Sequence, residues 1–212
     1  MALRADGKYW VIDGQHRVMA ALLRDDIIDL PCVLFDIDDI TAEAMGFWSA
    51  NSNRRNVSSL DKYRALIVAK DPLVLRIDKL LKDHSIKVQI SPAPLTFRAT
   101  SWAIKSAAED WVSFTKTIYL ITRLFTESAI HVNVCVGLYW IEHFSDLNIA
   151  DSRFERRIIQ CGALALTESI RKAILLRTFS NRTCADGILM EMNRGLRNPF
   201  KISAEEVTAK VE

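Results

Sequence analysis

The sequence of 212 residues is poor in the residues that interrupt regular structure, with seven glycines and five prolines. This scarcity argues against a disordered chain and against an all-β sandwich, which needs many tight turns. The net charge is also small, at +2 from 28 basic and 26 acidic residues, so bulk electrostatics predict no partner. Half of the residues are hydrophobic, which is enough for a large core, and we expect a helix-rich globular protein.

Cysteine pairs and long apolar segments are missing as well. No Cys-x-x-Cys motif occurs, and the spacing of the cysteines does not indicate a zinc site. The first residues have no apolar stretch like that of a signal peptide, and the most apolar segment, 129–141, is too short to span a bilayer. We expect a cytoplasmic protein without a membrane partner, whose cysteines are reduced and mostly buried. The cysteines are Cys32, Cys135, Cys161 and Cys184.

The first forty residues alternate between strand and helix signals. Asp6-Gly7 is a hairpin-turn pair, and the β-branched and aromatic residues that follow predict a strand over residues 8–12. Apolar positions at helical spacing then predict a helix over residues 15–23. Leu30 to Phe35 predicts a second short strand, in which Pro31 fits the first position or a sheet edge.

Helical signals dominate after residue 40. We expect a helix over residues 41–49 and a polar loop over 51–57. A capping box at Ser58 to Asp61 then starts a second helix. Asp71-Pro72 opens a third helix, with Leu75 on its apolar face. Ser91 to Pro94 looks like a linker, and only helices are expected beyond it, over residues 96–109, 111–126, 129–144, 151–166, 168–179 and 184–194. The sequence thus predicts an α/β head over residues 1–70 and an all-α helical domain over residues 71–212.

The turn between the first long strand and the first helix carries the most chemistry. Gly14 allows a sharp bend, and the free N–H groups of the helical turn that follows favour an anion. Arg17 can bind a phosphate with two hydrogen bonds, His16 can shuttle a proton, and Gln15 can orient a water or a substrate oxygen. Asp13 could bind a metal or hold His16. The same residues are also ordinary for a solvated first helical turn.

This segment resembles the phosphate-binding motif of the ParB/sulfiredoxin superfamily. Asp13 to Arg17, followed by Ala20-Ala21, is similar to the Asp-Gly-Gln-His-Arg variant of phage- and plasmid-encoded ParB-like proteins. Gln15 stands where sulfiredoxins have their catalytic cysteine, which excludes sulfinic acid reduction. The resemblance covers about residues 3–70 and implies the ParB/sulfiredoxin-like fold for the head.

A second segment, Asn51 to Arg54, resembles the ParB box that helps to hold a nucleotide and its magnesium. The resemblance therefore implies CTP or ATP with Mg²⁺ as cofactor, although Ala50 replaces the acidic residue of that box, which speaks against metal-assisted hydrolysis. ParB-like domains carry several dozen residues before the first motif, so either Met1 is a downstream start or the head is N-terminally shortened. We therefore expect weak or absent nucleotide binding by this chain alone.

The expected function is that of a nucleotide- or phosphate-binding protein in a DNA-associated process of a mobile element or its host, with DNA as partner and self-association through the helical domain. Two alternatives stay open. One is a phosphotransferase or nuclease with Asp13 and His16 as catalytic candidates, and the other is a non-catalytic helical interaction module with a vestigial site. The phosphate- or nucleotide-binding residues would be Gly14, Gln15, His16, Arg17, Asn51 and Arg54.

Three other groups of residues compete for a functional interpretation. Asp36, Asp38 and Asp39 could bind magnesium, but a helix cap near residue 41 is the stronger interpretation. Tryptophans and other aromatic residues recur at helical spacing in the body, which is typical of a core, and His131 and His143 are too far apart for a metal pair. Basic residues between 153 and 201 could contact a phosphate backbone or form a solvated face balanced by glutamates. These are Arg153, Arg156, Arg157, Arg171, Lys172, Arg177, Arg182, Arg194, Arg197 and Lys201.

Overall fold

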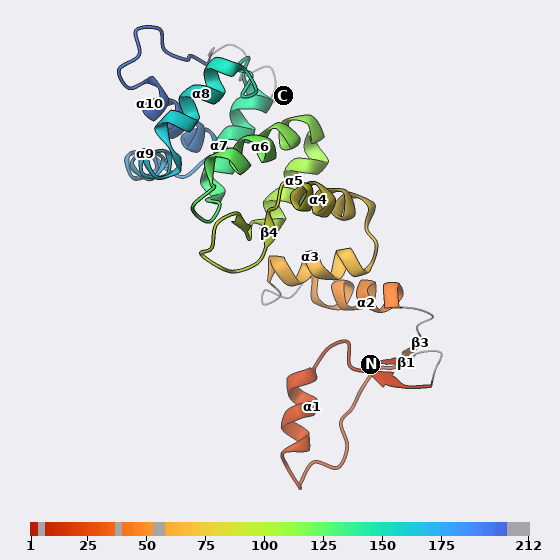
Figure 1. The fold of residues 1–212 in the computed structure, drawn as a ribbon. Helices are drawn as coiled ribbons and strands as arrows, with labels where there is room; N and C mark the ends of the chain where they lie inside the picture. The colour runs from red at the N-terminus through yellow and green to blue at the C-terminus, as the bar shows by residue number, and fades with distance from the viewer. Residues whose placement is uncertain (4–6, 37–39, 53–57, 203–212) are drawn as a thin grey trace. The chain divides into compact units, whose positions relative to one another are not determined.

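The computed structural model describes residues 1–3, 7–36, 40–52 and 58–202, and describes only the backbone of residues 2, 36 and 47–52. These residues form ten helices and five strands of two residues each, so helix dominates as the composition predicts. The chain divides into two compact units, residues 1–75 and 76–212 (Figure 1). Each unit has its own packing and is described by itself.

Unit 1 begins with a three-stranded sheet of order β2-β1-β3. β1 (Ala2–Leu3) pairs antiparallel with β2 (Tyr9–Trp10), which confirms that the flanks of the predicted hairpin pair with each other; Asp6 of its turn lies outside the described residues. The strand predicted over Leu30 to Phe35 is wrong in extent, because β3 is only Phe35–Asp36. β1 offers a parallel partner to these two residues alone, and Pro31 has no N–H for a longer ladder.

Three helices complete unit 1. α1 (Gln15–Leu22) follows the bend at Gly14. α2 (Ile40–Ser52) contacts α3 (Ser59–Val68). The predicted loop over 51–57 is wrong at its start, because Asn51 and Ser52 are still helical. The capping box is confirmed: Ser58 Oγ accepts from the Asp61 amide at 3.1 Å and donates to the Asp61 carboxylate at 2.7 Å.

The unit boundary falls within α4 (Pro72–Asp83), which begins at the proline as predicted. Val74, Ile77 and Leu81 are buried, whereas Leu75, which was expected on the apolar face, is 40% exposed.

Unit 2 contains a short sheet that the sequence did not reveal. β4 (Lys87–Val88) and β5 (Thr96–Phe97) pair in parallel, so the helix predicted from residue 96 starts only at Thr100. Ser91 to Pro94 connects these strands inside one unit and is no domain linker. The Thr96 hydroxyl, which has one proton to donate, lies 2.6 Å from the Ser91 carbonyl oxygen and 2.7 Å from that of Ala93, and so ties β5 to the connection.

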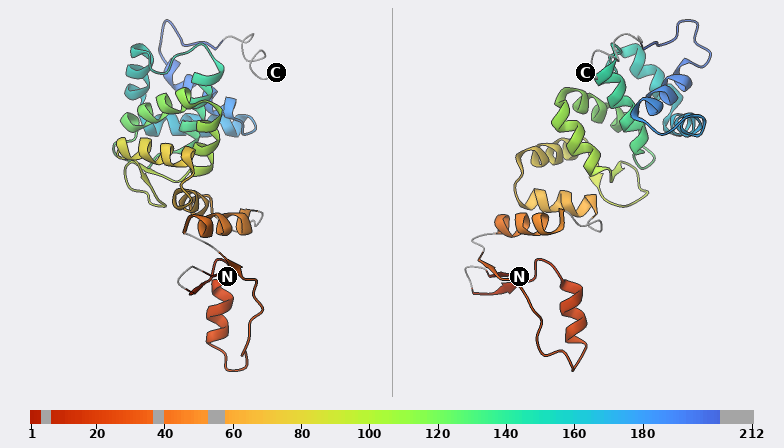
Figure 2. Two further views of the ribbon diagram at one scale, coloured as in Figure 1. Left: turned by 90° about the vertical axis from the view of Figure 1, so that its right-hand side faces the viewer. Right: turned by 180° about the vertical axis from the view of Figure 1, so that it is seen from behind.

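The remaining helices of unit 2 pack around a common core (Figure 2). The helix predicted over residues 151–166 is wrong, because Gly162, at a φ of 79°, ends one helix and precedes the next. α10 packs against α7 and α9, and at Gly187 the approach is so close that an added Cβ would lie 2.6 Å from Ile170 Cα. The helices are α5 (Thr100–Glu109), α6 (Trp111–Leu124), α7 (Val132–Phe144), α8 (Ser152–Cys161), α9 (Ala163–Leu176) and α10 (Asn181–Asn193).

Aromatic residues of unit 2 form core contacts, as their spacing predicts. The Trp102 ring lies within 6.2 Å of the rings of Phe97, Phe114 and Tyr139, although Tyr119 is 44% exposed. The prediction that the cysteines are mostly buried fails at Cys32, which is exposed, while Cys135 and Cys184 are buried and all four are free. Within the described parts of the chain, no helix combines the length and the apolar character needed to cross a membrane.

Candidate functional site

The bend before α1 has the backbone geometry that the sequence predicts. Gly14 adopts a left-handed conformation, with φ 86° and ψ 20°, which is costly for any residue with a side chain. Its carbonyl accepts from the amides of Arg17 at 2.9 Å and Val18 at 3.0 Å. Among the described residues, no acceptor is found for the amides of Gln15 and His16. Two N–H groups at the positive end of a helix therefore stay available for an anion.

Arg17 lies beside these amides. A Cβ added at Gly14 would lie 3.1 Å from Arg17 Nη2, so the absence of a side chain at residue 14 leaves room for the guanidinium. Arg17 Nη2 also lies 3.5 Å from Asp13 Oδ2, and the Arg17 side chain is 72% exposed. Because this ion pair is long and solvated, it contributes little and can yield to a competing anion.

The bend opens onto a cavity of about 890 Å³ in unit 1, which lies within the 300–1,000 Å³ typical of small-molecule sites. Asp13, Gly14 and Arg17 form its polar part. The rest is apolar and comes from Met1, the two residues between β2 and the bend, α1, the segment before β3, β3 and α2. These lining residues are Met1, Val11, Ile12, Val18, Leu30, Pro31, Cys32, Val33, Phe35, Ala42 and Gly46.

The apolar wall of the cavity was missed by the sequence analysis, and two of its residues, Cys32 and Phe35, matter most for a ligand. The exposed thiol of Cys32 and the 55% exposed ring of Phe35 come from a segment whose only signal was a short apolar run. The segment is brought to the bend by β3, where the Met1 amine donates to the Val33 carbonyl at 2.6 Å and the Phe35 amide to the Met1 carbonyl at 3.0 Å. A parallel pairing between residues more than thirty positions apart has no local sequence signal.

Gln15 and His16 are not among the residues that line the cavity. Both are exposed, and Gln15 Nε2 donates to the Val11 carbonyl at 3.4 Å. Their contribution to an anion site would therefore come from their backbone amides. Neither residue has a catalytic geometry with Asp13, whose described ion pair is with Arg17.

Several predicted site residues lie wholly or partly outside the described parts of the structure. Arg54, Asp38 and Asp39 are outside it, and only the backbone is described for Asn51 and Asp36. Within the described ranges, no group of three or more histidine, cysteine or carboxylate side chains is arranged for a metal ion. Asp13 is the one carboxylate among the described residues that line the cavity.

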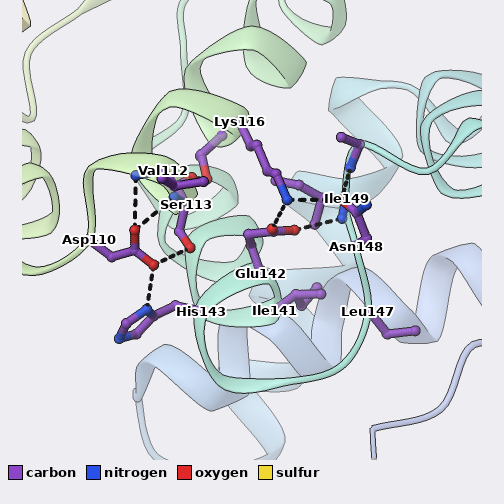
Figure 3. Close-up of polar contacts among 12 residues, drawn as sticks. Asp110, Val112, Ser113, Lys116, Ile141, Glu142, His143, Leu147, Asn148 and Ile149 are labelled. Carbon is purple, nitrogen blue, oxygen red and sulfur yellow. Dashed lines mark hydrogen bonds and ion pairs between the residues drawn. The ribbon is translucent and has the colours of Figure 1, made fainter.

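A second polar cluster, in unit 2, is structural rather than catalytic (Figure 3). Asp110 caps α6 by accepting from the amides of Val112 at 2.9 Å and Ser113 at 3.1 Å. The same carboxylate accepts from Ser113 Oγ at 2.6 Å and contacts His143 Nδ1 at 2.9 Å. Because Ser113 bonds to the aspartate and not to the histidine, the histidine is not placed to activate this hydroxyl.

This cluster ties α6 to α7 by electrostatics. Partial burial raises the pKa of Asp110, but the hydrogen bonds from Ser113, His143 and the two amides outweigh it and lower the pKa to about 2. Figure 3 also shows Lys116 with Glu142 and Asn148, and Glu142 Oε2 accepts from the Ile149 amide at 2.8 Å. His131, at the start of the same helix as His143, has its pKa lowered by burial and by the charges of Arg171 and Arg98.

Comparison of the chain with protein-family models, with curated proteins and with solved structures finds no match.

Proposed function

We propose that the chain is a ParB-like phosphate- or nucleotide-binding protein, and that the cavity at the start of α1 is its binding site. The observation that carries this proposal is that the left-handed Gly14 and the exposed Arg17 line one cavity, and that the available amides of Gln15 and His16 lie between them in sequence at the start of the helix. Amides at a helix start and a guanidinium are both well-suited donors to phosphate oxygens.

The cavity also suits the rest of a nucleotide. Its volume of about 890 Å³ is large enough for a base and a sugar, and Phe35 offers an aromatic face on which a base can stack. The fit is poorer for magnesium, because Asp13 is the one carboxylate that the described lining offers and magnesium prefers several oxygen ligands. The proposal is therefore CTP or ATP held through its phosphates, in which a metal would rely on the nucleotide's own oxygens.

The wider role rests on the resemblance of residues 13–21 and 50–54 to the ParB motifs. In this role the protein acts in the cytoplasm, in a DNA-associated process of a phage, a plasmid or their host, and self-associates through its helical unit. Asn51 and Arg54 would complete the site from the second motif.

Cys32 provides a direct test, because its exposed thiol lines the cavity. The rate of its alkylation by a maleimide is measured by peptide mass spectrometry, with and without CTP, ATP or inorganic pyrophosphate. We expect these anions to slow alkylation of Cys32 and not to slow it in Arg17→Ala. The matched control is Arg24→Ala, an exposed arginine that follows the same helix and pairs with Asp26.

Protection of Cys32 in Arg24→Ala but not in Arg17→Ala supports the proposal. Equal protection in the two variants, or none in the natural sequence at millimolar anion, contradicts it.

Phosphoryl transfer is the second candidate, and the position of Asp13 favours it. Its carboxylate lines the cavity beside Arg17, where a general base for an attacking hydroxyl or water would be needed. In that case Asp13→Asn abolishes turnover of ATP or CTP while binding persists. Turnover that survives in Asp13→Asn removes this candidate and leaves the binding proposal intact.

A further inference from the structure

Unit 2 carries a separate cationic depression between α8 and the segment that follows α10. Its volume is about 330 Å³. Arg153 and Arg156, the most exposed of its arginines, stand at the rim. Arg157, Gln160, Leu196 and Phe200 form the rest of its wall.

The charge of this depression is not balanced within the described structure. Four arginines elsewhere in unit 2 each pair with a carboxylate: Arg123 with Glu155, Arg171 with Glu168, Arg177 with Asp186, and Arg194 with Glu191. Arg153, Arg156 and Arg157 have no carboxylate within ion-pair distance among the described residues. Glu155, which lies between them in sequence, pairs with Arg123 and is not in the wall of the depression. The alternative of a face balanced by glutamates therefore holds for Arg171 and Arg194, which pair with Glu168 and Glu191, but not for the three arginines of the depression.

The three guanidiniums are held in place by neutral groups. Arg157 donates to the carbonyls of Met192 at 2.6 Å and Arg194 at 2.7 Å, which fixes it across the end of α10. Arg153 donates to the Asn198 carbonyl, and its guanidinium lies 4.4 Å from the centre of the Phe200 ring.

Arg156 is the most available of the three. Its one described hydrogen bond is from Nε to the Ser152 carbonyl, at 3.0 Å. A guanidinium has five N–H donors, so the four on its terminal nitrogens can bind an anion in a two-pronged geometry. The depression thus presents one arginine as a phosphate ligand and two as fixed positive charges.

We propose that this depression binds the phosphodiester backbone of a nucleic acid. Unpaired arginines that are held by backbone carbonyls keep their positive charge and direct N–H groups at phosphate oxygens. The site is open and two of its three arginines, Arg153 and Arg156, are exposed, which suits one stretch of a polymer better than a small molecule that must be enclosed. Arg153, backed by Phe200, presents a planar face on which a base can stack.

This site differs from the cavity at Gly14 in residues and in unit, so it can be tested independently. Binding of the full chain to a fluorescein-labelled 20-nucleotide DNA, single-stranded and duplex, is followed by anisotropy at several salt concentrations. For Arg156→Ala we expect roughly five- to tenfold weaker binding. The slope of log K against log salt concentration should also be less steep by about one. Arg156→Lys should recover part of the affinity.

The matched control is Arg171→Ala, which removes an exposed arginine that pairs with Glu168 in the same unit; its affinity should stay within about twofold of the natural sequence. Circular dichroism shows that each variant is folded. Arg156→Ala should weaken DNA binding by the same factor when Arg17 is also replaced by alanine.

Equal losses in Arg156→Ala and Arg171→Ala, or no DNA binding at low salt, overturn the proposal. The proposal is also overturned if poly-glutamate displaces the DNA equally well from the natural sequence and from Arg156→Ala.

Discussion

Replacing Asp13 by asparagine tests the electrostatics of the cavity in unit 1. The Asp13 carboxylate lies 3.5 Å from Arg17 Nη2 and lines the same cavity, so it competes with any anion for the guanidinium. Asparagine keeps the size of the side chain and removes the charge. In metal-free buffer, we therefore expect Asp13→Asn to bind pyrophosphate more tightly than the natural sequence.

The size of the effect follows from Coulomb's law. A phosphate on the free edge of the Arg17 guanidinium would be about 6 Å from the carboxylate, where two unit charges in water repel by roughly 0.7 kcal/mol. A dianionic phosphate doubles this to about 1.4 kcal/mol, and screening at physiological salt halves it again to about 0.7 kcal/mol, or about a threefold change in affinity. At low salt the gain should approach about tenfold.

The assay is isothermal titration calorimetry with pyrophosphate in EDTA, at two salt concentrations. Asp26→Asn is the matched control, because Asp26 is exposed, pairs with Arg24 and is absent from the cavity wall. Weaker binding of pyrophosphate to Asp13→Asn in the absence of metal would refute the reasoning, since it would mean that the carboxylate assists the anion. The same holds if the two variants show equal changes.

Three further expectations follow from the structure. Gly14→Ala should lose anion protection of Cys32. The left-handed φ of 86° costs roughly 1–2 kcal/mol for alanine, and the new methyl would lie 3.1 Å from Arg17 Nη2. Gly7→Ala, at a φ of 76° and with no atom within 4 Å of the added Cβ, should keep the protection. Asp110→Ala should lower the free energy of unfolding by about 2–3 kcal/mol in urea denaturation, since it removes a helix cap and the bonds to Ser113 and His143. Asp151→Ala, which removes a cap alone, should lower it by about 1 kcal/mol. The pKa of Asp110 falls from 3.8 to about 2 on folding, so its stabilisation is complete only above about pH 5 and is lost as the pH falls towards 2. The deficit of Asp110→Ala should therefore shrink between about pH 5 and pH 2.5, and a deficit independent of pH would contradict this account. Gly187→Ala should cost about 2–3 kcal/mol by the same measurement, because its Cβ would lie 2.6 Å from the backbone of Ile170, and a neutral result would show that α9 and α10 can separate without loss.

Local signals predicted the parts of the fold that depend on local chemistry. The bend at Gly14, the helix after it, the cap at Ser58 and the helix start at Pro72 all occur where glycine, serine and proline have strong positional preferences. The break at Gly162 was missed because the apolar positions on either side of it continue at helical spacing.

Long-range contacts could not be predicted in this way. The parallel pairing of β4 with β5 involves two residues in each strand, which is too short for a pattern, and Cys32 and Phe35 reach the cavity through the pairing of β3 with β1. The polar part of the candidate site, Asp13, Gly14 and Arg17, was proposed from the sequence because these residues lie within five positions of one another. Its apolar wall was not, because that wall is assembled from separate segments.

The most direct test of the central claim is the response of the Gln15 and His16 amides to an anion. In ¹H–¹⁵N correlation spectra of the full chain, titration with CTP, ATP or pyrophosphate should shift these two amide resonances and that of Arg17 downfield and saturably, with smaller shifts in α3. Arg17→Ala should weaken the response, and Arg24→Ala should preserve it. Unchanged Gln15 and His16 resonances at millimolar anion, or equal shifts spread over both units, would contradict an anion site at the start of α1.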